Sequence, residues 1–277
     1  MSTATAPASI APATSRRVPI TPVTQSSSIR SEWIKFTTLR STWITLVIAL
    51  VGTIGVGALA SWAIDQHWSH LSAGDRLAFS PVTQSLTGVY LAQLVIGVLG
   101  VLVISGEYAT GMIRATLTAS PRRLQVLWSK LAVFVSVDLV LMTVAAFGAF
   151  FVGQALLHSH GTTLGAPDAL RSVVGVGLYL AVVGIIAVSI GFIVRSTAGG
   201  IASVVGLLIV LPAIAHVLPA SWQRDYVRFL PSNAGGALYT IHPDPGTLSP
   251  WTGFAVMCLW ALVGLAVAAV LLQRRDA

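Results

Sequence analysis

Six long apolar stretches constrain this chain more than any other feature of its sequence. An α-helix needs about 20 apolar residues to cross the hydrocarbon core of a bilayer. The stretches are 43–64, 84–105, 131–157, 173–194, 199–218 and 251–272, and only the third carries an acidic residue. Backbone polar groups in lipid must be satisfied within the segment, which helices achieve. The sequence therefore predicts an all-α membrane protein with six transmembrane helices.

The rest of the composition agrees with a chain embedded largely in lipid. Only 9% of the 277 residues are charged, against roughly 25% in soluble domains. Residues 1–28 are rich in Ala, Pro, Ser and Thr, a composition that cannot bury a core and indicates a disordered cytoplasmic tail. Residues 29–277 are predicted to form the six-helix transmembrane domain.

The distribution of basic residues predicts the orientation. Six crossings place both termini on the same side. Of the 16 Lys and Arg residues, the opposite side holds only Arg76, Arg171, Arg224 and Arg228. Because positive residues in short loops are retained in the cytoplasm, both termini are expected there. The net charge of +7 is then explained by topology and anionic headgroups, and nucleic-acid binding is not expected.

Two segments beside the spans have distinctive patterns. From Ile29 to Arg40 the apolar residues Ile29, Trp33 and Phe36 fall on one helical face, with Arg30, Glu32 and Lys35 around the rest. This spacing predicts an amphipathic helix at the interface, the alternative being a basic entry to the first span. The long loop 219–250 is too apolar to lie wholly in water, which favours short re-entrant helices shielded by protein.

The most informative segment is a charged island between the second and third spans. It runs from Glu107, through Tyr108, Gly111, Met112, Ile113 and Arg114, to Arg122, Arg123 and Lys130. A short helix through 110–117 would place Ile113 and Leu117 together. At the cytoplasmic face, such a segment would meet a soluble partner, and its arginines would set the orientation of the complex.

Tests for catalytic and metal chemistry find little. The chain has no phosphate-binding loop of the form G-x-x-x-x-G-K-[ST]. The pairs His67/His70 and His158/His160 have no neighbouring Cys or carboxylate pattern that closes a metal site, so no metal is expected. No catalytic residue is assigned. Asp138 is the one acid inside a span, and it is either structural or a substrate or proton site.

The chain resembles the transmembrane permease subunits of type 2 ATP-binding-cassette (ABC) exporters. The resemblance rests on Glu107-Tyr108-x-x-Gly111-Met112-Ile113-Arg114-x-x-Leu117, then Pro121-Arg122-Arg123, with Lys130 opening the next span. It also rests on Ser31-Glu32-Trp33-Ile34-Lys35, similar to the connecting helix of that family, and on Leu230-Pro231-Ser232-Asn233-Ala234-Gly235, similar to its re-entrant segment. It extends from about Ile29 to Arg275.

The resemblance implies a mechanism. Residues Gly111–Leu117 would form a coupling helix that inserts into a separate ATPase subunit, and Glu107 would brace that helix. ATP and Mg would be bound by that partner, so this chain is not expected to be an enzyme or to hold a cofactor. Two permease chains, identical or different, would work with two ATPases in a bacterial inner membrane. The Arg195–Gly199 turn would be a second contact.

The apolar interior favours export of a hydrophobic or amphipathic substrate such as a drug, lipid or natural product. Two other functions stay open at this point. One is a stand-alone proton-coupled carrier in which Asp138 titrates. The other is a membrane sensor or scaffold that binds a regulator through the basic island without transporting anything.

Overall fold

The computed structural model describes residues 24–113, 116, 123–215, 217, 219–242 and 246–274. Within these ranges the chain is helical throughout its regular structure, with no strand. Six helices are long and apolar enough to cross a membrane, which confirms the predicted number. They are α2 (Arg40–Gln66), α5 (Val89–Ala109), α7 (Arg123–Leu156), α8 (Ala169–Val194), the helix Thr197–Ala215 and α13 (Pro250–Arg274).

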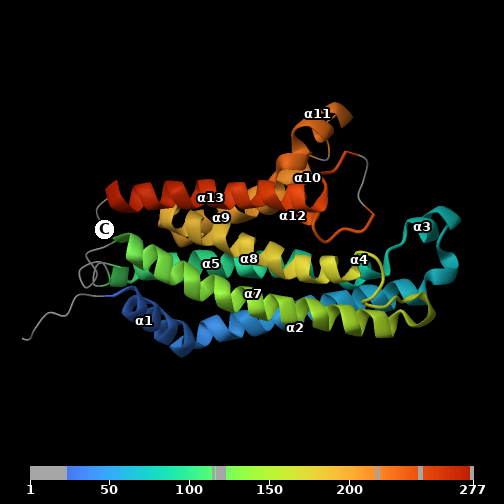
Figure 1. Ribbon diagram of the computed structural model, residues 1–277, viewed down its shortest axis with the longest axis horizontal. Coiled ribbons are helices and arrows are strands. Elements are labelled where there is room, and N and C mark those ends of the chain that lie inside the picture. The colour runs from blue at the N-terminus through green and yellow to red at the C-terminus, as the bar shows by residue number, and fades with distance from the viewer. Residues whose placement is uncertain are drawn as a thin grey trace, which may run out of the picture.

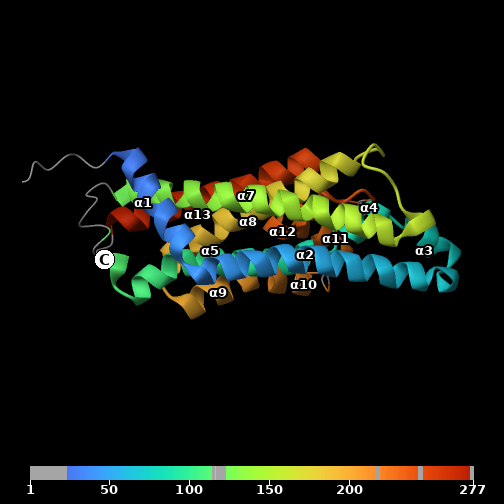
Figure 2. The same cartoon turned by 90° about the horizontal axis from the view of Figure 1, so that it is seen from below.

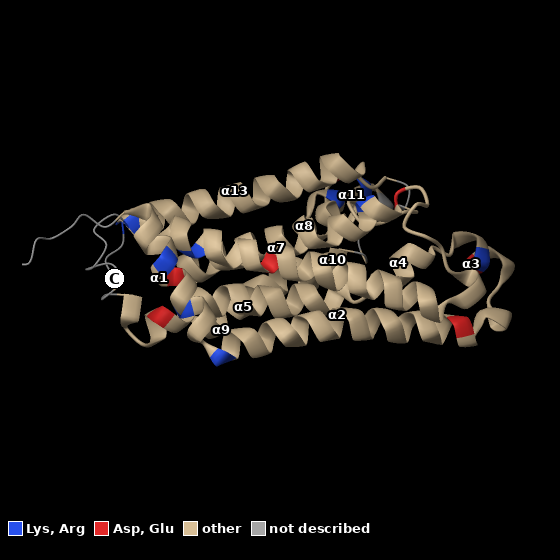
Figure 3. Ribbon diagram, turned by 60° about the horizontal axis from the view of Figure 1, so that its bottom comes forward, with Lys and Arg blue, Asp and Glu red and all other residues tan. Residues whose placement is uncertain are grey.

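The six helices lie side by side as an elongated bundle (Figures 1 and 2). One end carries α1 (Gln25–Thr38), the last turns of α5 and α13, and the start of α7. We call it the α1 end. The opposite end, the α3 end, carries α3 (Ala73–Ala78). Charged residues gather toward these two ends and leave the middle of the bundle almost free of charge (Figure 3).

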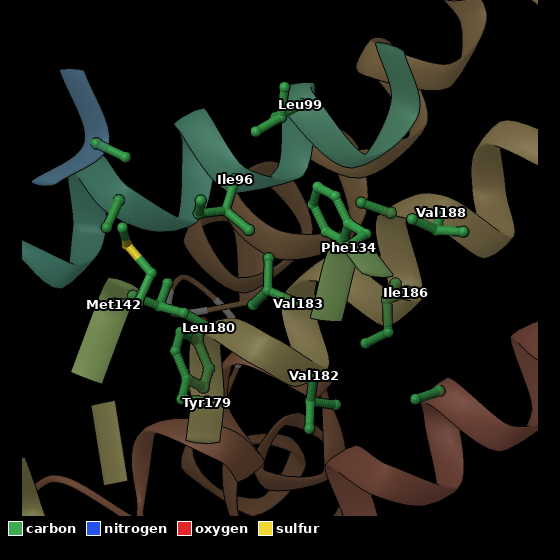
Figure 4. Packing of buried hydrophobic residues seen from close by; sticks show 14 of the residues in the cluster. Ile96, Leu99, Phe134, Met142, Tyr179, Leu180, Val182, Val183, Ile186 and Val188 are labelled. Atoms are coloured by element: carbon green, nitrogen blue, oxygen red, sulfur yellow. The ribbon is translucent and has the colours of Figure 1, made fainter. Parts of the chain in front are cut away.

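Helix α8 is the centre of the bundle. In its most apolar stretch 78% of the residues are buried, against 28% in α2 and in α13. Its side chains Leu180, Val183 and Val188 face residues of α5 and α7, among them Ile96 and Phe134 (Figure 4). The outer helices therefore present their apolar faces outward, as expected where lipid is the solvent.

Two of the six helices start five or more residues away from the predicted position. The second span begins at Val89 rather than Gln84, because Pro81–Ser85 forms the separate short helix α4. The break lies at Gly88, where an added Cβ would come within 2.0 Å of the carbonyl oxygen of Thr53. The third span begins at Arg123, eight residues before the predicted start at Leu131, so Lys130 lies inside α7 rather than at its opening.

The first helix also differs from its prediction. Thr24 caps α1 with its side chain, so residues 25–28, which we expected in the tail, form its first turn. The buried residues of α1 are Glu32 and Phe36, whereas Trp33 is 48% exposed. The amphipathic pattern had placed Trp33 and Phe36 on one face and Glu32 elsewhere. Glu32 is buried instead of Trp33 because it has a basic partner, Lys130, on α7.

The fifth span contains a local defect. Its helix starts as α9 (Thr197–Val205), widens into a π-turn at Gly206–Val210 and continues as α10 (Leu211–Ala215). Pro212 lacks a backbone N–H and its ring would clash with the carbonyl four residues earlier, so the regular helix cannot run through it. A π-turn accommodates such a disruption.

Candidate functional site

Four charged side chains from three helices meet at the α1 end of the bundle. Lys130 Nζ on α7 lies 2.7 Å from Glu32 Oε2 on α1 and 2.7 Å from Glu107 Oε1 on α5. Lys35 Nζ on α1 lies 2.8 Å from Glu32 Oε1 and 3.2 Å from Glu107 Oε1. Each lysine thus donates to both carboxylates. We call these four residues the charge cluster.

The charge cluster is electrically balanced, with two carboxylates and two ammonium groups. The side chain of Lys130 is only 2% exposed, and those of Glu32 and Glu107 are 10% and 7% exposed. Ions buried this deeply cost several kcal/mol of desolvation each, and only good geometry offsets that cost. The cluster therefore fixes how α1, α5 and α7 sit against one another.

Lys35 is the most exposed member of the cluster, at 30%. Burial lowers the pKa of Lys35, but hydrogen bonding and charge from Glu32 and Glu107 outweigh that effect, and the pKa stands above its ordinary value. Lys35 Nζ also lies 3.5 Å from Thr116 Oγ1 in the segment between α5 and α7. This contact joins the cluster to the charged island.

Apolar and polar contacts also hold α1 against α7. The rings of Phe36 and Phe134 meet edge to face with their centroids 6.4 Å apart. At the other end of α1, its first residue Gln25 donates from Nε2 to Ser129 Oγ at 3.2 Å. Helix α1 is thus held along its length and does not hang free of the bundle.

The predicted coupling segment is described only in part. Gly111 has φ +71, a conformation that favours glycine, and it ends the turn after α5. Met112 is 45% exposed, whereas Ile113 is buried. The other predicted members, Arg114, Leu117 and Arg122, lie outside the described residues. The prediction that 111–117 docks a partner therefore stays a prediction.

Two further contacts tie the ends of this segment to the rest of the bundle. Tyr108, in the last turn of α5, lies under the guanidinium of Arg195, with 5.0 Å from Cζ to the ring centroid. Arg123, at the start of α7, donates from Nη1 to the carbonyl oxygen of Leu272 at 3.1 Å. The Arg195–Gly199 turn is thus beside α5, and the last helix is beside the start of α7.

The predicted re-entrant segment packs inside the bundle at its α3 half. Pro231 begins the short helix α12 (Pro231–Gly236). Asn233 Nδ2 donates to the carbonyl oxygen of Val227 at 3.1 Å, which closes the turn before α12. A Cβ on Gly235 would come within 2.3 Å of Met257 Sδ and 2.6 Å of the Tyr179 ring, so only glycine lets α12 approach α8 and α13 this closely.

Of the two His pairs seen in the sequence, for which no metal site is expected, His158/His160 meets a carboxylate. His158 Nδ1 and His160 Nδ1 lie 3.3 and 3.1 Å from the two carboxylate oxygens of Asp65, at the end of α2. Local spacing could not reveal this contact, because Asp65 is 95 residues from His160. Across the described residues, no three His, Cys, Asp or Glu side chains are arranged to hold a metal ion.

Asp138 stands apart from all of these groups. It lies near the middle of α7, is 1% exposed, and faces α8. In the part of the chain that the structure describes, neither carboxylate oxygen has a hydrogen-bond partner. Of the residues predicted to form a functional site, it is the one that the bundle leaves unsatisfied on both oxygens.

Comparison with known proteins adds an independent finding. A model of the family described as ABC-2 family transporter protein matches residues 28–216, more than half of the chain. The matched region contains the charge cluster, the segment between α5 and α7, and the first five spans. No curated protein matched the chain.

Proposed function

Because this chain belongs to the ABC-2 transporter family, we propose that it is the transmembrane permease subunit of an ATP-driven exporter. The observation that carries the proposal is the charge cluster. It joins α1, α5 and α7 at the point where the segment between α5 and α7 begins. A force applied to that segment would reach three helices at once.

The contacts around the segment supply a path for that force. Thr116 lies beside Lys35 of the cluster, Tyr108 beside Arg195, and Arg123 beside the carbonyl of Leu272. An ATPase subunit that docks on residues 111–117 would therefore act on α1 through the cluster, on the α8–α9 turn through Arg195, and on α13 through Arg123. Buried, packed contacts of this kind move as units rather than deforming gradually.

The chemistry of ATP belongs, in this proposal, to the partner. The sequence contains no phosphate-binding loop, and ATP and Mg would bind the ATPase subunit, whose closure supplies the work. This chain would then be a permease and not itself an enzyme. Two permease chains and two ATPases would make the working complex, in a bacterial inner membrane with both termini in the cytoplasm. The excess of Lys and Arg on that side supports the orientation.

The apolar interior supports a hydrophobic or amphipathic substrate, such as a drug, a lipid or a natural product. The middle of the bundle holds almost no charge (Figure 3). Ions and sugars would find few polar partners there, whereas an apolar molecule would exchange lipid contacts for side-chain contacts at little cost.

Co-purification tests the proposal. The tagged chain would be extracted gently from its native membrane and its partners identified by mass spectrometry. A stoichiometric ATPase with a phosphate-binding loop is the expected result. Its absence, under conditions that preserve other membrane complexes, would contradict the proposal.

Two matched substitutions then locate the docking surface. Met112→Asp places a charge at the exposed Met112, and the complex with the ATPase should be lost or weakened at least about tenfold. Leu77→Asp makes the same kind of change on α3, where Leu77 is 85% exposed at the far end of the bundle, and should leave assembly unchanged. Equal behaviour of the two variants would move the docking surface elsewhere.

A further inference from the structure

Asp138 is the one acidic residue of the long helix α7. The side chain is almost completely buried, and neither of its oxygens has a hydrogen-bond partner in the described ranges. An ionised carboxylate in such a place costs several kcal/mol unless a positive charge accompanies it. Because burying the Asp138 carboxyl group without a partner is costly, its presence there points to a function beyond packing.

Within the described residues, no basic side chain pairs with Asp138. On α7 itself the nearest basic residue is Lys130, eight residues earlier and about 12 Å along the helix, where it is engaged in the charge cluster. The ionisable side chains of the elements packed on α7 are Arg30, Glu32 and Lys35 on α1, Arg40 and Asp65 on α2, Tyr90, Glu107 and Tyr108 on α5, Arg171 and Tyr179 on α8, Cys258 and Arg274 on α13, and His158 and His160 after α7. Most of these lie toward the helix ends.

The ionisable group of this set that lies deepest in α8 is already engaged. Tyr179 is completely buried and its hydroxyl donates to Gln93 Oε1 on α5. It also stacks edge to face on Tyr239, with ring centroids 5.3 Å apart. In the described ranges, the carboxyl group of Asp138 has no hydrogen-bond partner and lies against Gly184 of α8.

Asp138 and Phe134 converge on one glycine of the neighbouring helix. A Cβ added to Gly184 would come within 2.7 Å of Phe134 Cε1 and 2.9 Å of Asp138 Oδ2. The ring and the carboxyl group, one turn apart on α7, therefore both lie against the backbone of α8 (Figure 4 shows Phe134 beside α8). An aromatic ring beside a buried carboxylate is the chemistry that recognises organic cations.

We propose that Asp138 is a cation-exchange site, at which a proton in the closed bundle is replaced by the positive charge of a lipophilic cation during transport. The proposal rests on the proposed function and deepens it by naming the substrate class. The exchange is balanced: the carboxylic acid releases one proton to water, and the carboxylate formed is neutralised by the bound cation. No bond of the substrate is made or broken.

The packing of α7 against α8 determines where the site opens. In the observed packing Gly184 closes the space in front of the carboxyl group, so a cation reaches Asp138 when α7 and α8 separate at this level. No hydrogen bond joins the two helices at Asp138 or Gly184 in the described part of the chain. The contact between α7 and α8 at this level is therefore made by apolar groups, and a lipophilic molecule can replace these contacts with its own.

Binding of tetraphenylphosphonium to the purified chain in lipid nanodiscs tests the proposal. Calorimetry in two buffers of different ionisation enthalpy counts the protons released. We expect one proton released per cation bound, and an affinity that rises about tenfold per pH unit while the carboxyl group is protonated. Tetraphenylborate, an anion of the same shape, should bind without releasing a proton.

The near-isosteric variant Asp138→Asn should abolish proton release and remove the pH dependence of tetraphenylphosphonium binding. Asp65→Asn, which removes a carboxylate at the α3 end, should change neither. Cation binding that is equally tight and equally pH-dependent in Asp138→Asn would overturn the proposal, as would the absence of any saturable cation binding to the unaltered chain.

A second measurement uses the unaltered chain, so its result does not depend on whether the variant folds. Dicyclohexylcarbodiimide adds to buried carboxyl groups, the carboxyl proton passing to a carbodiimide nitrogen as an oxygen bonds to the central carbon. Tetraphenylphosphonium should slow labelling of Asp138 at least about fivefold, and unchanged labelling would count against the site. These experiments need no ATPase, so their failure leaves the co-purification result standing, and the reverse also holds.

Discussion

Lys130 of α7 and Glu107 of α5 form a buried ion pair, with 2.7 Å between Nζ and Oε1. Glu107 lies in the last turn of α5, and Lys130 lies near the start of α7. The pair therefore bridges the two ends of the segment between these helices. The second oxygen of Glu107 has no partner in the described residues. Glu32 also pairs with Lys130, which makes α1 part of the same unit.

Replacing Lys130 with Met should strongly destabilise the protein. The change leaves the carboxylates of Glu32 and Glu107 with the partly exposed Lys35 as their shared partner. Breaking a buried ion pair by removing one partner costs about 3–5 kcal/mol. Unfolding of the purified chain in mixed micelles, followed by circular dichroism, measures this loss.

Lys35→Met is the matched control, since it removes the same charge from the same two carboxylates. The side chain of Lys35 is far more exposed than that of Lys130, and water can take its place. The expected loss is about 1 kcal/mol or less. If Lys35→Met were as damaging as Lys130→Met, burial would not be what gives the cluster its strength.

The pH dependence of stability follows from the raised pKa of Lys35. Because the folded-state pKa exceeds the ordinary value of 10.5, the protonated lysine stabilises the folded chain fully below that value. The contribution is lost as pH rises through the folded-state pKa. Melting temperatures from about pH 9 to pH 12 should therefore fall, and part of the fall should be missing in Lys35→Met. Identical profiles for the two chains would show that Lys35 gains nothing from its carboxylates.

The fold was largely predictable because one signal governs it. A run of about 20 apolar residues can cross a bilayer only as a helix, and the six runs gave six helices. The boundaries were less predictable. Residues Arg123 to Lys130 are too polar to count as part of a span, yet they continue α7 because their polar side chains find partners within the protein.

The site was predictable only in its separate parts. Glu107 and Lys130 belong to the charged island, and Glu32 to the amphipathic helix, but Glu32 and Lys130 are 98 residues apart in sequence. No local pattern reveals that they meet. The same separation explains why the apolar spacing placed Trp33 on the inner face of α1. Spacing alone cannot distinguish an acid that is buried beside a distant partner, such as Glu32, from an acid exposed to solvent.

Arg123→Gln should loosen the end of the last helix. The guanidinium of Arg123 donates to the carbonyl oxygen of Leu272, one of the carbonyls that a helix end leaves without an internal partner. We expect amide exchange in the last turn of α13 to quicken on the order of fivefold, which corresponds to about 1 kcal/mol for such a hydrogen bond. Exchange measured by mass spectrometry tests this. Arg274→Gln, which removes a positive charge at the same end, should have less effect, and equal effects would assign the result to charge alone.

Two glycines of α2 offer the sharpest test of how the α3 half of the bundle is packed. An added Cβ at Gly57 would lie 2.1 Å from the carbonyl oxygen of Ser85, whereas one at Gly55 would meet nothing within 4 Å. Backbone cannot move aside as a side chain can, so Gly57→Ala should push α4 away from α2 and cost about 1–3 kcal/mol. Gly55→Ala should instead be neutral or stabilise the helix by up to about 1 kcal/mol, because alanine favours helix more than glycine does. Thermal unfolding of the two variants, side by side, measures both effects. Equal stability of the two would mean that α4 does not rest on α2 at Ser85.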